Sequence, residues 1–311
     1  MEILPFLLWP FVASLILTGI HAYLGVHVVE RGVIFVDLAL AQIAALGATI
    51  AILLGMDVHG QHAYWLSLAF TFIGAAIFAF ARTRAGHIPQ EAFIGIAYAV
   101  ASAAAIIAMS KATGETEHLK DMLVGNILAV DKAEVVKTAI LYGAVGLFHY
   151  IFRHNFLLIS TDPLAAEERG LNIRLWDFMF YASFGFVVTS SVSIAGVLLV
   201  FCYLIAPSVG AMLFAEGIGP RLAIGWTMGT LVSALGVLFS VWLDLPTGAT
   251  IVCTFGVVLT LMFLLHMLFF HGPRARPLKG ARSARDLDAL DSRTATGTKP
   301  ARAAGVTRPS S

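Results

Sequence analysis

The chain has 311 residues, of which 59% are hydrophobic and 13% are charged, and its mean hydropathy is +0.85. Soluble domains carry about 25% charged residues, so this composition excludes a soluble globular protein and indicates membrane-spanning helices. The formal net charge is only +1, and the two cysteines, Cys202 and Cys253, lie in apolar runs. Their spacing suggests neither a disulfide nor a metal site.

Apolar stretches that approach the roughly 20 residues needed to cross a bilayer recur along the chain. The stretch 178–214 is too long for one crossing, so we divide it near Ala195 and Gly196 into two spans, or a span and a re-entrant piece. The sequence therefore predicts an all-α polytopic membrane bundle of about eight or nine transmembrane helices within residues 1–271. The expected spans are 9–29, 32–54, 64–81, 92–109, 138–152, the two parts of 178–214, 222–243 and 249–271.

The basic residues predict the orientation of the spans. Arg31, Arg82, Arg153 and Arg221 all fall on one side of the alternation, together with the end of the chain, and the positive-inside tendency makes that side cytoplasmic. Residues 272–311 are basic and contain few large apolar side chains. We expect them to form a disordered cytoplasmic tail, which a role as a solvated anchor near anionic lipid explains better than nucleic-acid binding.

A polar stretch at 161–177 interrupts the apolar pattern and predicts a short helix. Asp162 suits the N-cap and Pro163 suits the first helical position. Arg169 falls in the last turn, and Gly170 can adopt the left-handed conformation that ends a helix. Two turns of helix are not stable alone in water, so this segment either docks on a partner or lies as a linker at the headgroups.

Four polar residues within the expected spans are candidates for handling a divalent cation: His21, Asp37, Gln42 and Glu91. Each also has a structural interpretation. His21 suits a hydrogen-bonded packing histidine, Asp37 suits an interfacial partner of Arg31, and Glu91 suits a carboxylate at a helix N-terminus.

Two clusters in the predicted outer loops have the residue types of a metal-collecting vestibule. One contains Asp57, His59 and His62, and the other contains Glu117 and His118. Ordinary solvated loops explain both clusters more simply. The chain has no phosphate-binding G-x-x-x-x-G-K-[ST] loop, nucleophile elbow or H-E-x-x-H motif, so we do not expect it to be an enzyme or to hydrolyse ATP itself.

The order and spacing of several segments resemble the permease subunits of bacterial ABC importers for zinc, manganese or iron. The segments are GVHVVERGVIFVDLALAQIAALG (25–47), EAFIGIAYA (91–99), HLKDMLVGNILAV (118–130), TDPLAAEERGLNIRLWDF (161–178) and LDLPTGATIV (243–252). The resemblance implies a permease domain at 1–271 in the bacterial inner membrane, with a cytoplasmic coupling loop at 153–177. It also implies a separate ATPase subunit, a second permease copy and a periplasmic or lipid-anchored metal-binding protein.

In this family the A-A-x-x-x-G segment docks on the ATPase and couples ATP hydrolysis to rearrangement of the spans. A divalent metal ion would be the transported substrate, with no permanently bound cofactor and no nucleic acid. The resemblance assigns the coupling role to Asp162, Pro163, Ala165, Ala166, Glu167, Arg169, Gly170 and Leu171.

The second span departs from the family pattern. Family members usually read F-L-G-D-A-L-S-H-A-x-L-P-G there, whereas this chain has Leu38 in place of the Asp and Gln42 in place of the His. Asp37 lies one residue earlier, about 100° around the helix. An ion-coupled secondary transporter, with Asp37, Glu91 and His21 as a relay, is the alternative function, and a non-transporting membrane scaffold is a third.

Overall fold

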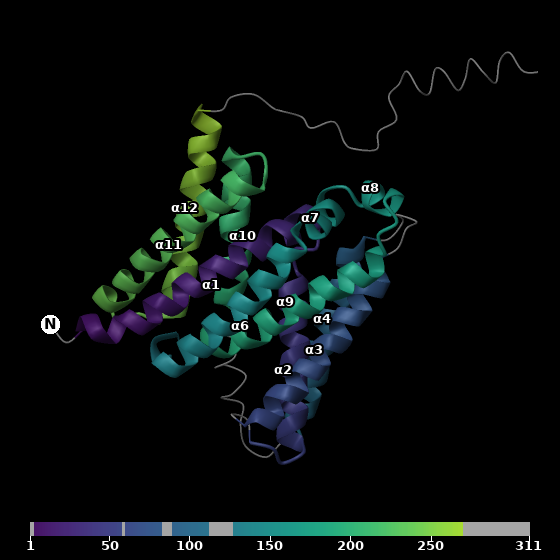
Figure 1. Ribbon diagram of the computed structural model, residues 1–311. Coiled ribbons are helices and arrows are strands. Elements are labelled where there is room, and N and C mark those ends of the chain that lie inside the picture. Colours follow the sequence, from purple (N-terminus) through teal and green to yellow (C-terminus); the bar gives the residue numbers. More distant parts are fainter. Residues whose placement is uncertain (1–2, 58–59, 83–88, 112–126, 270–311) are drawn as a thin grey trace, which may run out of the picture. The chain divides into compact units, whose positions relative to one another are not determined.

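A computed structural model describes residues 3–57, 60–82, 89–111 and 127–269, with side chains from residue 7 onward. Within these ranges the chain is helical and contains no strand (Figure 1). These described residues form one compact unit, and the predicted tail lies outside them. The helices are α1 (Ile3–Arg31), α2 (Val36–Leu53), α3 (Gln61–Ala81), α4 (Gln90–Met109), the 3-10 helix η1 (Ile127–Ala129), α6 (Lys132–Ile151), α7 (Arg153–Thr161), α8 (Pro163–Glu168), α9 (Ile173–Ala195), α10 (Val197–Phe214), α11 (Ile218–Leu243) and α12 (Thr247–Phe269).

The number of membrane-spanning helices agrees with the sequence. In the described residues, 8 helices are long and apolar enough to cross a membrane, or up to 9 if the bent pair α6–α7 forms one span. This pair bends by 75° where α6 gives way to α7. The prediction of a loop from residue 153 was wrong in one respect, because residues 153–161 continue as helix α7 after this bend.

The long apolar stretch 178–214 divides where the sequence predicts. Gly196 adopts a φ of 77°, which a glycine accepts without strain, and it separates α9 from α10. Pro207 lies inside α10 and does not end it. Each of these helices is long enough to span a bilayer by itself, so two spans describe the region better than one span and a re-entrant piece.

Glycines allow several helix pairs to approach closely. A Cβ atom on Gly47 of α2 would lie 2.8 Å from the Cα of Ser67 in α3. A Cβ atom on Gly25 of α1 would overlap the backbone oxygen of Leu204 in α10. At these points the backbones themselves are in contact, and no larger residue fits without a shift.

The helices form two groups, and α1 lies in the first. It packs against α10 and α11, which also contact α12, and against α6 and α7 (Figure 1). The other group consists of α2, α3 and α4, and α9 packs against α2 and α3. Polar side chains near the C-terminal end of α1 therefore lie within reach of several helices that are distant in sequence.

Candidate functional site

The short helix α8 has the ends that its sequence predicts. The side chain of Asp162 accepts a hydrogen bond from the backbone N–H of Ala165 at 3.1 Å, and Pro163 is the first helical residue. Arg169 is the C-cap, one residue after the last helical position, and Gly170 follows with a φ of 76°. Local sequence therefore determines both boundaries of this helix.

The exposed side chains of α8 form its candidate docking face. Leu164 is 74% exposed, and Glu167, Arg169 and Gly170 are also exposed. Ala166 is 0% exposed because α8 packs against α7 and α9. Ala166 therefore faces the permease, and of the residues to which the resemblance assigns the coupling role, a partner can contact the exposed ones.

Asp37 and Glu91 lie together at the N-terminal end of α2. Asp37 is buried, and its Oδ1 accepts a hydrogen bond from the backbone N–H of Leu38 at 2.8 Å. Glu91, in the first turn of α4, accepts a hydrogen bond from the backbone N–H of Phe35 through Oε1 at 3.0 Å. Glu91 Oε2 is buried and has no hydrogen-bond partner among the described residues. The structure thus places two carboxyl groups near each other at one end of a span.

The other two candidates in the spans do not join this pair as ligands. Both ring nitrogens of His21 are occupied: Nδ1 lies 2.8 Å from the backbone oxygen of Leu17, and Nε2 lies 3.2 Å from Ser191 Oγ. This geometry matches the packing histidine that the sequence offers as an alternative. Gln42 is five residues after Asp37, so it points about 140° away around α2. In the described part of the chain, no three His, Cys, Asp or Glu residues are placed to hold a metal.

The two predicted vestibule clusters are only partly within the described residues. Asp57 and His62 are exposed, near the start of α3. His59, Glu117 and His118 lie outside the described residues. The structure therefore neither joins nor separates the two clusters, and the vestibule stays a prediction.

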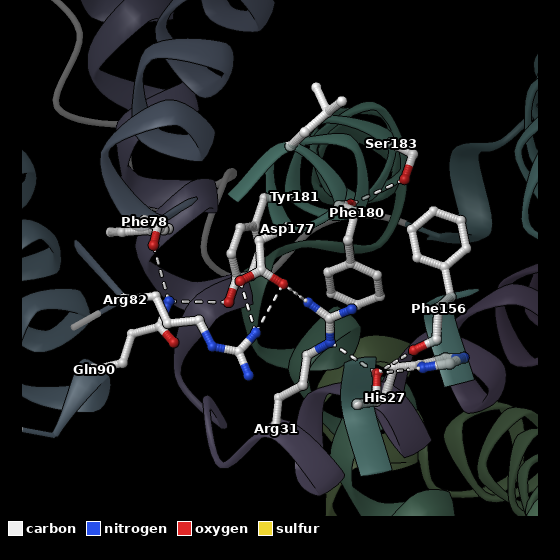
Figure 2. A network of polar contacts seen from close by, with 12 residues as sticks. His27, Arg31, Phe78, Arg82, Gln90, Phe156, Asp177, Phe180, Tyr181 and Ser183 are labelled. Carbon is white, nitrogen blue, oxygen red and sulfur yellow. Dashed lines mark hydrogen bonds and ion pairs between the residues drawn. The ribbon is translucent and has the colours of Figure 1, made fainter. Parts of the chain in front are cut away.

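Sequence reasoning missed a buried polar network at the C-terminal end of α1 (Figure 2). Asp177 of α9 receives hydrogen bonds from both Arg31 and Arg82, and its side chain is fully buried. Ser160 of α7 lies 2.8 Å from His27 Nδ1 and accepts a hydrogen bond from Arg31 Nε at 2.9 Å. The only evidence for this network in the sequence is that its charged residues fall near helix ends on the same predicted side of the membrane. Nothing in the sequence pairs them.

A family model described as the ABC 3 transport family matches residues 3–270, which is most of the chain. The chain belongs to the ABC 3 transport family. It is therefore a membrane-spanning permease of the ABC transporter class, as the resemblance implies, and the secondary-transporter alternative is not favoured.

The similarity between this permease and its curated relatives extends over most of the length of both chains. It is 28% identical over 271 residues to the manganese transport system membrane protein MntC of Listeria innocua. The aligned region covers 85% of this chain and 90% of the relative. It is 23% identical to the chelated iron transport system membrane protein YfeD of Yersinia pestis, over 90% of both chains.

A solved structure confirms the fold of the permease. PsaBC from Streptococcus pneumoniae in complex with Fab matches with a TM-score of 0.70 and 24% identity, covering 88% of this chain and 94% of the other. At this level of identity the likeness concerns the arrangement of the helices, which is the predicted all-α bundle.

Proposed function

We propose that this permease carries a divalent metal ion of the manganese or iron class across the bacterial inner membrane into the cell. The relatives named for manganese and chelated iron transport support this cargo, and the metal would be a transported substrate with no resident cofactor. Zinc is the third metal of the predicted class, and the candidate ligands of this chain do not distinguish it from manganese and iron. The permease itself would carry no catalytic activity.

The helix α8 is the observation that carries the proposal. It is a capped, two-turn helix outside the spans that packs on α7 and α9 and keeps Leu164 exposed on its outer face, where a partner surface can cover it. We infer that this partner is an ABC ATPase subunit, whose closure on ATP would move α8 as a rigid body. A second permease copy and an extracytoplasmic metal-binding protein would complete the importer, with residues 272–311 as a cytoplasmic tail.

A pull-down tests this proposal directly. The tagged full-length chain, extracted in mild detergent from its own cells, is expected to bring with it a polypeptide that binds ATP. The same preparation, reconstituted in liposomes, is expected to take up Mn²⁺ only when ATP is supplied on the side of α8. A well-folded chain that copurifies with no ATPase, or that transports Mn²⁺ without ATP, would contradict the proposal and favour an ion-coupled carrier.

We further propose that Asp37 and Glu91 form the cation-handling pair that replaces the usual second-span residues. Carboxylate oxygens suit manganese, and Glu91 Oε2 is a buried acceptor with no hydrogen-bond partner in the part of the chain that the structure describes. Gln42 points about 140° away from Asp37 around α2, and His21 has no nitrogen left to offer, so neither residue joins the pair. The pair supplies a small number of oxygen ligands, and weak binding suits a site that must release its ion.

Replacing Asp37 with asparagine is expected to lower Mn²⁺ uptake by about tenfold or more, because the substitution removes the charge of a ligand while keeping its shape. His62→Ala is the control in the outer cluster and is expected to leave uptake within about twofold. Initial uptake rates in reconstituted liposomes measure both variants. Equal losses, or a larger loss in the His62 variant, would move the cation site to the outer loops.

A further inference from the structure

The C-terminal end of α1 is bonded to several helices at once. Arg31 reaches Asp177 in α9 and Ser160 in α7, and Arg82 at the end of α3 reaches the same aspartate (Figure 2). The neighbouring Glu30 forms an ion pair with Arg221 in α11. Helices from both groups of the bundle therefore meet at adjacent residues of α1.

The centre of this junction is the Arg31–Asp177–Arg82 cluster. Arg31 Nη1 lies 2.7 Å from Asp177 Oδ1, and Arg82 Nη1 lies 2.7 Å from Asp177 Oδ2. The side chain of Arg31 is only 2% exposed, and its guanidinium lies 4.0 Å from the centre of the Phe180 ring. The carboxylate and its two guanidinium partners are thus held in a single geometry by charge, hydrogen bonds and an aromatic face.

Ser160 connects this cluster to the candidate docking helix. Its hydroxyl accepts a hydrogen bond from Arg31 Nε and lies within hydrogen-bond distance of His27 Nδ1. Ser160 is at the end of α7, and Asp162, which caps α8, is two residues further along the chain. Ser160 is therefore the residue through which a displacement of α8 could reach Arg31.

The charges of the cluster exclude a role in binding the cargo. Its two guanidinium groups and one carboxylate carry a net positive charge in a buried setting, which repels a divalent cation. Stability is also a poor explanation, because buried ion clusters replaced by apolar residues of similar volume are often neutral or stabilising. Among the described residues, Arg31 Nη2 is buried and has no hydrogen-bond partner.

We propose that the Arg31–Asp177–Arg82 cluster, joined to α7 through Ser160, is the positioning device that transmits movement of α8 to α1, α3 and α9. This inference rests on the proposed ATP-driven function and assigns the residues that connect the docking helix to the spans. Because these residues act on other helices and touch no cargo, they are expected to change how much transport each ATP supports while the ion and the ATPase still bind.

The test replaces the whole cluster, in the full transporter with its copurified ATPase. The variant Arg31→Met, Arg82→Met, Asp177→Leu removes every charge at once, so no buried charge is left alone. We expect it to insert, to keep its thermal unfolding midpoint and to retain the ATPase. Mn²⁺ taken up per ATP hydrolysed is expected to fall by about tenfold or more. The control is Tyr203→Phe, which removes a buried hydrogen bond to Ser233 between α10 and α11 and is expected to leave this ratio unchanged.

The smaller variant Ser160→Ala breaks only the connection to α7 and decides the question if the triple variant does not insert. It is expected to lower Mn²⁺ uptake per ATP, and Ser160→Thr, which keeps the hydroxyl, is expected to restore it. An unchanged ratio in the triple variant, or in Ser160→Ala, would overturn the proposal. Loss of the ATPase from either variant would also overturn it, because the residues would then shape the docking face. A wild-type chain without any ATPase would instead refute the proposed function itself, before any variant is made.

Discussion

Replacing Leu164 with glutamate is expected to abolish ATP-driven Mn²⁺ uptake while the chain still inserts in the membrane. Leu164 is 74% exposed on α8, the most exposed large apolar side chain of that helix. An apolar side chain at the centre of an interface becomes desolvated when a partner binds, and a carboxylate in the same place is buried without a counter-charge. A penalty of about 3 kcal/mol would weaken ATPase binding by about 150-fold.

Copurification of the ATPase and the Mn²⁺ uptake rate measure this effect, and the amount of folded chain in the membrane separates it from misfolding. Leu175→Glu is the matched control, because Leu175 is 53% exposed at the start of α9 but lies outside α8. We expect this control to keep the ATPase. A Leu164→Glu chain that retains both the ATPase and transport would show that α8 does not contact the partner through its exposed face.

Replacing Gly25 with alanine is expected to have the largest effect on stability of any single methyl group added to this chain. The added Cβ would overlap the backbone oxygen of Leu204 and lie close to the Oγ of Ser208. A backbone oxygen within α10 cannot rotate away as a side chain can, so α1 and α10 must separate. Overpacking costs about 1–3 kcal/mol, and we expect a fall in the unfolding midpoint of about 5–10 °C.

Thermal unfolding in detergent, followed by loss of helical circular dichroism, measures this fall. The matched control is Gly19→Ala, two turns earlier in the same helix, where an added Cβ meets nothing within 4 Å. This control is expected to be neutral or to gain up to about 1 kcal/mol from helix propensity. Equal midpoints for the two variants would mean that α1 and α10 are not in backbone contact.

Local sequence determined the elements of this permease and the ends of its most informative helix. Runs of apolar residues require helices in a bilayer, because a helix pairs all of its backbone groups within one segment. Asp162 and Gly170 bound α8 through interactions with residues three or four positions away, and Gly196 ends α9 for the same local reason. Such signals span only a few residues, so they are readable without any knowledge of the fold.

Tertiary structure alone decided which polar residues meet. It showed that Ala166 is buried, that both nitrogens of His21 are occupied, and that Glu91 bonds to the backbone two residues before Asp37. It also brought Arg31 and Asp177 together, which are separated by 146 positions in the chain. A charged residue at a helix end looks the same in sequence whether it faces water, lipid headgroups or another charge. Only the packing of whole helices selects its partner, because the burial that makes an ion pair necessary is created by residues from every part of the chain.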